Sequence, residues 1–264
     1  MKIAVCYSGY LRILEKTFYH IKNSILTNYD VDYFIHTWDN DSYLSEINFA
    51  KKILKPKIFL KETPKTFERN PYSFINCSLT EEKYLDQLEK SKENKIFTPI
   101  PSEKNNFKFD KSTEVVKFKY YSSYPHDVLS QYYSIYKSIQ LKKIYEQQNN
   151  FEYDCVIRIR SDFICDPIDI QNFDLNQINL PNCPIHRGTD LTVNDHFAFS
   201  SSKNMDIYSE CFLFIPTYYF IYKIDFIQEL LLGKHLRVNN LDINKINLPF
   251  LVSRDGVNKQ LEKY

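Results

Sequence analysis

Three polar segments of the sequence each follow a short apolar run that has the composition of a β-strand. They are Ser8–Arg12, His36–Asp39 and Arg158–Asp162. In open α/β sheets, ligands bind beside the carboxyl ends of the strands, at the point where the strand order reverses. Because arginine, histidine and aspartate side chains gather at such ends, the three segments together indicate a site for a polar, anionic ligand.

The first segment combines a glycine with a nearby arginine. Gly9 would allow the backbone to approach a ligand closely, and Arg12 would lie in the first turn of the following helix, near its free N–H groups. A diphosphate or a uracil-like base suits that place. The same residues also fit an ordinary tight turn with a surface arginine. The segment lacks the GxGxxG pattern of dinucleotide-binding folds, which disfavours a nicotinamide cofactor.

The third segment places two positive charges on one face of a predicted strand, because Arg158 and Arg160 alternate with isoleucines. Such charges need anions or carboxylates as partners, since burying them unpaired is costly. Asp162 has the same parity and could be that partner. The segment therefore predicts either an anion site or an internal Arg–Asp pair, and its position at a strand end favours the anion site.

The elements that must position these segments alternate as in an α/β fold. Apolar runs predict strands at residues 3–7, 31–37, 57–60, 153–159, 178–180 and 196–199, with a last extended segment at 246–254. Helical periodicity predicts helices at 11–26, 43–54, 126–148 and 225–236, and another that begins near 205. We therefore expect a mostly parallel central sheet flanked by helices. Residues 64–124 are irregular and charged, and they predict a solvated insertion or a flap over the site.

The composition excludes some classes of protein. The chain has 264 residues, with 34 Lys and Arg against 33 Asp and Glu, and this balance disfavours nucleic acid as the main partner. No apolar run approaches the roughly 20 residues that cross a bilayer, so we expect no transmembrane segment. Six cysteines without a CxxC pair suggest neither a zinc site nor a redox motif. We expect a cytoplasmic protein, either free or peripheral to a membrane.

Several blocks of the sequence, in their order along the chain, resemble one known group of proteins. They are AVCYSGYLR, DVDYFIHTWD, SQYYSIYKSIQLKKIYE with YDCVIRIRSDF, and NDHFAFSS. These blocks are similar to bacterial and viral glycosyltransferases of the GT-A type that are linked to the synthesis of surface polysaccharides such as capsule and lipooligosaccharide. The resemblance covers most of the chain and is weak between residues 64 and 124. It implies a single GT-A (nucleotide-diphospho-sugar transferase-like) domain over residues 1–264.

The resemblance also implies an activity and its residues. The activity is transfer of a sugar from a nucleotide-diphosphate sugar to a glycan or lipid-linked glycan acceptor. The expected donor-binding residues are Ser8, Gly9, Arg12, Gln131, Ser134, Arg158, Arg160 and Arg254. Gln131, Ser134 and Ser138 recur at helical spacing, which is equally typical of a solvent-facing stripe.

The expected catalytic residues are Asp162 and Asp195. In GT-A enzymes an Asp-x-Asp after the central strand holds Mn²⁺ or Mg²⁺, and this chain keeps only its second acidic residue, Asp162. Asp162 could ligate a metal, or Arg158 and Arg160 could neutralise the diphosphate instead. Asp195 would accept the acceptor's hydroxyl proton in an inverting transfer, although an Asn-Asp pair is also typical of a turn.

Two other functions fit the same sequence. A nucleotidyl- or sulfo-group transferase would share the strand-end arginines but would use a donor without a sugar. A non-catalytic glycan-binding or scaffold protein would use some of the 21 tyrosines and 20 phenylalanines as stacking platforms, although most of them must be core.

Overall fold

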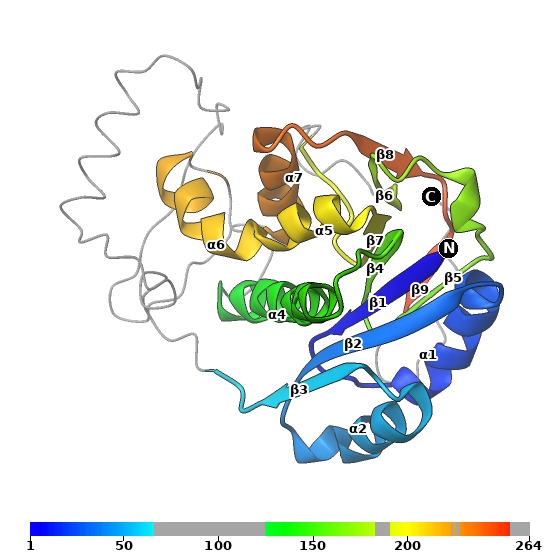
Figure 1. Ribbon diagram of the computed structural model, residues 1–264. Coiled ribbons are helices and arrows are strands. Elements are labelled where there is room, and N and C mark those ends of the chain that lie inside the picture. Colours follow the sequence, from blue (N-terminus) through cyan, green and yellow to red (C-terminus); the bar gives the residue numbers. More distant parts are fainter. Residues whose placement is uncertain (66–124, 183–190, 223, 225–226, 254–264) are drawn as a thin grey trace.

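The computed structural model describes residues 1–65, 125–182, 191–222, 224 and 227–253 (Figure 1). Most of the irregular segment 64–124 lies outside the described residues. The centre of the molecule is a seven-stranded sheet with the order β3-β2-β1-β4-β7-β6-β8. Four strands form its parallel half: β1 (Lys2–Ser8), β2 (Asp30–Trp38), β3 (Ile58–Glu62) and β4 (Cys155–Ile159).

The other half of the sheet is mixed. Strand β7 (Phe197–Ser200) runs antiparallel to β4 and to β6 (Ile178–Pro181), and β6 is parallel to β8 (Ile243–Ile246). The expectation of an α/β fold with a mostly parallel central sheet is therefore confirmed.

Helices cover both faces of the sheet (Figure 1). One face carries α4 (Pro125–Asn149), α5 (Ser202–Ser209), α6 (Cys211–Pro216) and α7 (Gln228–Val238). The other face carries α1 (Leu14–Ile21), α2 (Leu44–Phe49) and a two-stranded sheet of β5 (Phe163–Cys165) and β9 (Phe250–Val252). Because both faces are covered, residues that alternate along β1 are buried in two separate apolar clusters.

The predicted elements agree with the structure within a few residues over most of the described chain. Helix α4 ends at Asn149, and Asn150 adopts a left-handed φ of +52°, as its helix-ending role requires. The extended segment expected at 246–254 contains β9 and begins at the last residue of β8, whereas β5 and β8 were not predicted.

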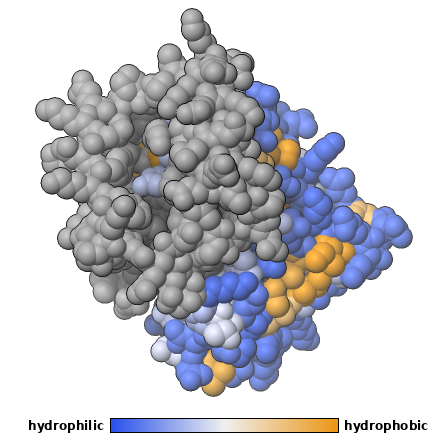
Figure 2. Space-filling view, turned by 90° about the vertical axis from the view of Figure 1, so that its left-hand side faces the viewer, coloured by the Kyte–Doolittle hydropathy of each residue, from blue (hydrophilic) through white to orange (hydrophobic). Residues whose placement is uncertain are grey.

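On the face that Figure 2 shows, the coloured surface is mainly hydrophilic, with separate apolar areas. Exposed large apolar side chains are distributed over five helices and a helical turn, at Tyr19, Leu44, Ile53, Ile144, Leu213, Phe214 and Val238. Isolated exposed residues of this kind are normal in folded proteins. Within the described ranges, no helix combines the length and the apolar character needed to cross a bilayer.

The strand order reverses between β1 and β4. From β1 the chain proceeds to β2 and β3 on one side, and it returns through α4 to β4 on the other side. This is the position at which open α/β sheets bind ligands. The segments that follow β1 and β4 are two of the three polar segments that the sequence singled out.

Candidate functional site

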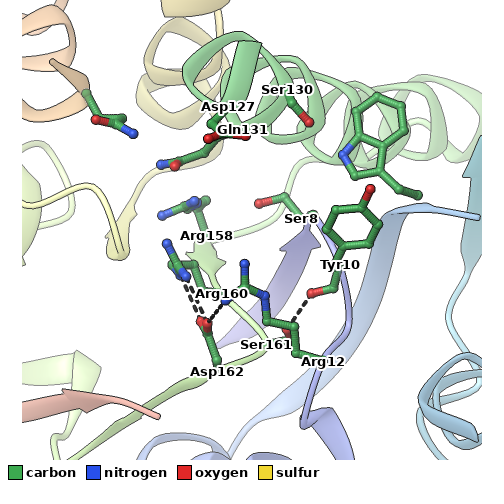
Figure 3. A pocket seen from close by; sticks show the side chains of 13 residues that line it. Ser8, Tyr10, Arg12, Asp127, Ser130, Gln131, Arg158, Arg160, Ser161 and Asp162 are labelled. Atoms are coloured by element: carbon green, nitrogen blue, oxygen red, sulfur yellow. Dashed lines mark hydrogen bonds and ion pairs between the residues drawn. The ribbon is translucent and has the colours of Figure 1, made fainter. Parts of the chain in front are cut away.

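A cavity of about 360 Å³ lies at the carboxyl ends of β1 and β4 (Figure 3). Its walls are the loop after β1, the end of β4 and the first turns of α4, with contributions from β2 and the start of α7. The lining residues are Ser8, Gly9, Tyr10, Arg12, Trp38, Asp127, Ser130, Gln131, Arg158, Arg160, Ser161, Asp162 and Gln228. Seven of the residues expected from the sequence are therefore brought together: Ser8, Gly9, Arg12, Gln131, Arg158, Arg160 and Asp162.

Asp162 lies between two arginines (Figure 3). Arg160 donates from Nε to Oδ1 and from Nη2 to Oδ2, both at 2.8 Å, and Arg12 Nη1 lies 3.3 Å from Oδ2. The internal Arg–Asp pair that the sequence allowed is thus present. Burial acts to raise the pKa of the Asp162 carboxyl, but the hydrogen bonds and charge of Arg160, with the charge of Arg12, outweigh burial and hold that pKa below its ordinary value.

Arg158 is a buried cation on the cavity wall, and 1% of it is exposed. Its Nη1 donates to the main-chain carbonyl of Asp195, and its Nε has no hydrogen-bond partner within the described ranges. The hydroxyl of Ser8, also on the wall, is likewise buried without a partner there. Since buried polar groups are normally hydrogen-bonded, two unpaired atoms on one cavity indicate a polar ligand that completes the site.

The loop after β1 has an unusual backbone. Gly9 has a φ of +93°, and Arg12 has a φ of +31°, a region that residues with a side chain adopt at a cost of about 1–3 kcal/mol. Two contacts hold the loop against the end of β4. The Ser161 hydroxyl donates to the Tyr10 carbonyl at 2.8 Å, and Thr17 donates to the Ser161 carbonyl at 2.6 Å. The strained conformation places the Arg12 guanidinium beside Asp162.

The role expected for Gly9 is only partly right. A Cβ added at Gly9 would meet no atom within 4 Å, so the positive φ, and not crowding, requires glycine here. Its N–H points away from the cavity, because it donates to Ser134 Oγ at 2.6 Å and to the His36 carbonyl at 3.2 Å. Ser134 itself is fully buried behind the loop and is not part of the lining. Unlike the other described residues expected to bind the donor, Ser134 therefore contacts the loop and not the cavity.

The expected proton acceptor, Asp195, is 3% exposed and lies behind the wall. Gln131 donates its amide to Asp195 Oδ2, and His196 Nε2 lies 3.4 Å from Oδ1. Burial acts to raise the pKa of Asp195, but its electrostatic interactions with His196, Arg158 and Arg160 and the hydrogen bond from Gln131 outweigh burial and keep that pKa below its ordinary value. Asp195 itself does not line the cavity, but it contacts two residues that do, Gln131 and Arg158.

A second carboxyl, Glu229, lies near Asp195 and was not predicted. It follows Gln228, which lines the cavity at the start of α7. Burial, and then the charge of Asp195, raise the pKa of Glu229 above its ordinary value. The sequence carries no specific signal for it, because acidic residues are common in the first turn of any helix. Raised and lowered carboxyl pKa values side by side are typical of acid–base sites.

Two aromatic side chains line the cavity and were also missed. Tyr10 has its ring centroid 5.4 Å from that of Tyr43, and Trp38 stacks on Tyr133 at 5.5 Å with an angle of 16° between the rings. Tyr10 and Trp38 belong to the polar segments after β1 and β2, so their place at strand ends was the available signal. The cavity therefore combines aromatic side chains with a cationic set, Arg12, Arg158 and Arg160.

The described residues do not fit a divalent metal centre. Both oxygens of Asp162 already accept hydrogen bonds from Arg160, and Arg12 adds a second positive charge. Within the described ranges, no three His, Cys, Asp or Glu side chains form a group that could hold a metal ion.

Two residues of the C-terminal part lie apart from this cavity or outside the described residues. His235 is buried between Tyr218 Oη (2.7 Å) and the Ile207 carbonyl (2.6 Å), which is a packing role. Arg254, the remaining donor-binding prediction, lies outside the described residues.

In comparisons with known proteins, no family model matches the chain, and no curated protein is significantly similar to it. The cavity has three arginines and two carboxylates, Asp127 and Asp162, on its wall. The functional conclusion therefore depends on the residues of this cavity and on its position in the sheet.

Proposed function

We propose that the protein is a GT-A-type glycosyltransferase that binds a nucleoside-diphosphate sugar between β1 and β4 and transfers the sugar to a surface glycan or its lipid-linked precursor. The observation that carries this proposal is Arg158. A buried guanidinium with an unpaired Nε, on a cavity that also holds Arg12 and Arg160, favours an anionic ligand. A diphosphate supplies that anion.

The fold supports one nucleotide rather than two. Strands β1, β2 and β3 with α1 and α2 form one mononucleotide-binding half of a doubly wound sheet. The second half does not repeat it, because β7 is antiparallel to both of its neighbours. A dinucleotide cofactor would need two such halves. The aromatic side chains of Tyr10 and Trp38 suit stacking against a base and ribose, while the arginines suit the phosphates.

In the transfer, negative charge develops on the leaving nucleoside diphosphate as the glycosidic bond breaks. Preorganised positive groups lower the barrier most, because they need not reorganise during the reaction. Arg12, Arg158 and Arg160 are held in place before the donor binds, two of them by Asp162. Asp162 is then a positioning residue, and the arginines take the part that a metal takes in Asp-x-Asp enzymes.

The amides of Gln131 and Gln228 lie on the same cavity and suit the hydroxyl groups of a sugar. Asp195 and Glu229 do not line the cavity, but each adjoins one of these glutamines, and they are the two candidates for the group that accepts the acceptor's proton. Glu229, whose pKa is raised, matches neutral pH better than Asp195, whose pKa is lowered. The variants Asp195→Asn and Glu229→Gln separate them, since loss of the base removes the acidic limb of the pH–rate profile.

The test is a turnover screen with UDP-, GDP-, CMP- and dTDP-linked sugars, in which release of the nucleotide and transfer to a glycan acceptor are both measured. We expect one nucleotide family to be used, with loss of turnover in Arg158→Met. Equal use of a nucleotide donor without a sugar would favour a nucleotidyl- or sulfo-group transferase. Absence of both turnover and nucleotide binding would contradict the proposal and leave the glycan-binding alternative.

A further inference from the structure

A chain of hydrogen bonds runs behind the cavity, from the loop after β1 to the edge strand β3. Ser134 Oγ accepts the N–H of Gly9 at 2.6 Å and lies 2.7 Å from His36 Nδ1. His36 Nε2 lies 2.8 Å from Glu62 Oε2, and Tyr133 donates to the same oxygen at 2.9 Å. Ser134 and His36 are fully buried, and they belong to different elements, α4 and β2.

The protons of this chain can be arranged so that every group is satisfied. The Glu62 carboxylate accepts, so His36 Nε2 carries the hydrogen and Nδ1 is left as an acceptor. Ser134 therefore donates its hydroxyl proton to Nδ1, and a lone pair of Oγ remains for the Gly9 N–H. Burial lowers the pKa of His36 to about 4 against the opposing effect of Glu62, so the ring is neutral near pH 7.

The order of the groups is that of a serine–histidine–acid triad, but the geometry excludes a nucleophile. Ser134 is fully buried and is absent from the cavity lining, and its oxygen is already occupied by Gly9. A nucleophile must reach the reacting carbon. What the chain of bonds does reach is the backbone of the loop, at the residue next to Tyr10.

We propose that Ser134, His36 and Glu62 are positioning residues that hold the Ser8–Arg12 loop in the conformation that binds a nucleoside diphosphate. The inference rests on the proposed function. Arg12 in this loop has a positive φ, and such strain in a residue with a side chain persists only where the surroundings over-determine the backbone. The Gly9–Ser134 bond supplies one constraint at the start of the loop, and the Ser161–Tyr10 bond supplies a second one residue later.

The same residues support the aromatic side of the cavity. The His36 ring packs edge-on against Trp38, with ring centroids 4.9 Å apart. The Tyr133 ring stacks on Trp38, with ring centroids 5.5 Å apart. Tyr10 and Arg12 depend on the loop, whereas Arg158 and Arg160 come from β4. Loss of the chain of bonds should therefore weaken a ligand that spans both sides more than a ligand that meets only the arginines of β4.

Ser134→Ala tests this directly, with Ser138→Ala as its matched control. Both serines are fully buried on α4, and the Ser138 hydroxyl donates to the Ile135 carbonyl of its own helix. The probes are UDP, GDP and inorganic pyrophosphate, with Kd measured by calorimetry. We expect Ser134→Ala to weaken the nucleoside diphosphate about tenfold and pyrophosphate less, as the loss of one buried hydrogen bond implies. Ser138→Ala should bind as the wild type does.

A second pair of variants covers the case in which Ser134→Ala does not fold. Glu62→Gln keeps an oxygen that can accept from His36 Nε2, and Glu62→Leu removes it. We expect Glu62→Gln to retain binding and Glu62→Leu to lose it, with the ¹⁵N signals of His36 showing the Nε2–H tautomer in the wild type.

Wild-type binding of a nucleoside diphosphate, with unchanged Kd in Ser134→Ala and Glu62→Leu, would overturn the positioning role and leave the proposed function in place. Absence of binding to the wild type by UDP, GDP and related diphosphates would overturn both.

Discussion

Arg160 and Asp162 form a bidentate ion pair at the end of β4, with Nε–Oδ1 and Nη2–Oδ2 distances of 2.8 Å. The pair uses two of the five N–H groups of the guanidinium. It therefore fixes the plane of Arg160 and still leaves donors for a ligand. Arg12, from the other side of the strand-order reversal, meets the same carboxylate at 3.3 Å. One aspartate thus orients two arginines that arrive from different loops.

Asp162→Asn should reduce affinity for a nucleoside diphosphate about tenfold, because both arginines lose their charged anchor. It should also destabilise the fold by about 3 kcal/mol, as expected when one partner of a buried pair is removed. Calorimetry in the presence of EDTA and of Mn²⁺ provides the measurement. Wild-type binding that requires Mn²⁺, with only the metal-dependent part lost in Asp162→Asn, would show instead that Asp162 is a metal ligand.

Arg158→Met should destabilise the fold by less than the loss of a directly paired buried cation does, because its guanidinium donates to a main-chain carbonyl and supports the buried Asp195 carboxylate only through its charge. Lys142→Met is the matched contrast. Lys142 is fully buried and lies 3.0 Å from Glu146 and 2.7 Å from Asp206, so its loss leaves Glu146 without this cation and Asp206 with Lys143 alone among the described residues. We expect a loss of about 3 kcal/mol there, measured by urea unfolding. Equal destabilisation by both variants would mean that Arg158 is structural.

The fold could be predicted from the sequence where the periodicity was long enough. The strands that became β1, β2 and β4 are rich in aliphatic and aromatic residues, and α4 has many turns of helical spacing. Strands β5 and β9 have three residues each, too few to show alternation, and they pair across most of the second half of the chain.

The cavity could be predicted in part for a related reason. Position at strand ends selected Arg12, Arg158 and Asp162, which the structure brings to one cavity, because parallel strands end at one edge of the sheet. Glu62 and its contact with His36 could not be found in this way. They depend on the register of β3 against β2 and on the packing of α4, which the sequence does not display.

Gly233→Ala should destabilise the protein strongly. A Cβ at this position would lie 1.6 Å from the Leu191 carbonyl oxygen, so the backbone that leads to Asp195 would have to move. We expect a loss of about 3 kcal/mol or more, because overpacking against backbone relaxes poorly. Gly9→Ala meets open space and should cost about 1 kcal/mol through its positive φ. Thermal unfolding compares the two, and a similar loss in both would contradict this account.

Stability should fall as the pH decreases from about 6.5 towards 4. Burial lowers the pKa of His36 and of His235 to about 4 from an ordinary value of 6.5. Between these values the unfolded chain binds protons that the folded protein does not. The free energy of unfolding therefore decreases as the pH falls, by up to about 3 kcal/mol for each histidine. Urea unfolding at pH 7.5 and 5.0 checks this, with His36→Asn and His235→Asn flattening the dependence. A wild-type free energy equal at both pH values would contradict the shifts.

The central claim is that the arginine cavity between β1 and β4 binds a nucleoside diphosphate. The most direct measurement is a calorimetric titration of the wild type and Arg158→Met with UDP, GDP and dTDP in EDTA. The account predicts that at least one of them binds the wild type without metal, and that Arg158→Met weakens that binding at least tenfold while it remains folded. Failure of all three to bind the wild type, or an unchanged Kd in Arg158→Met, would contradict it.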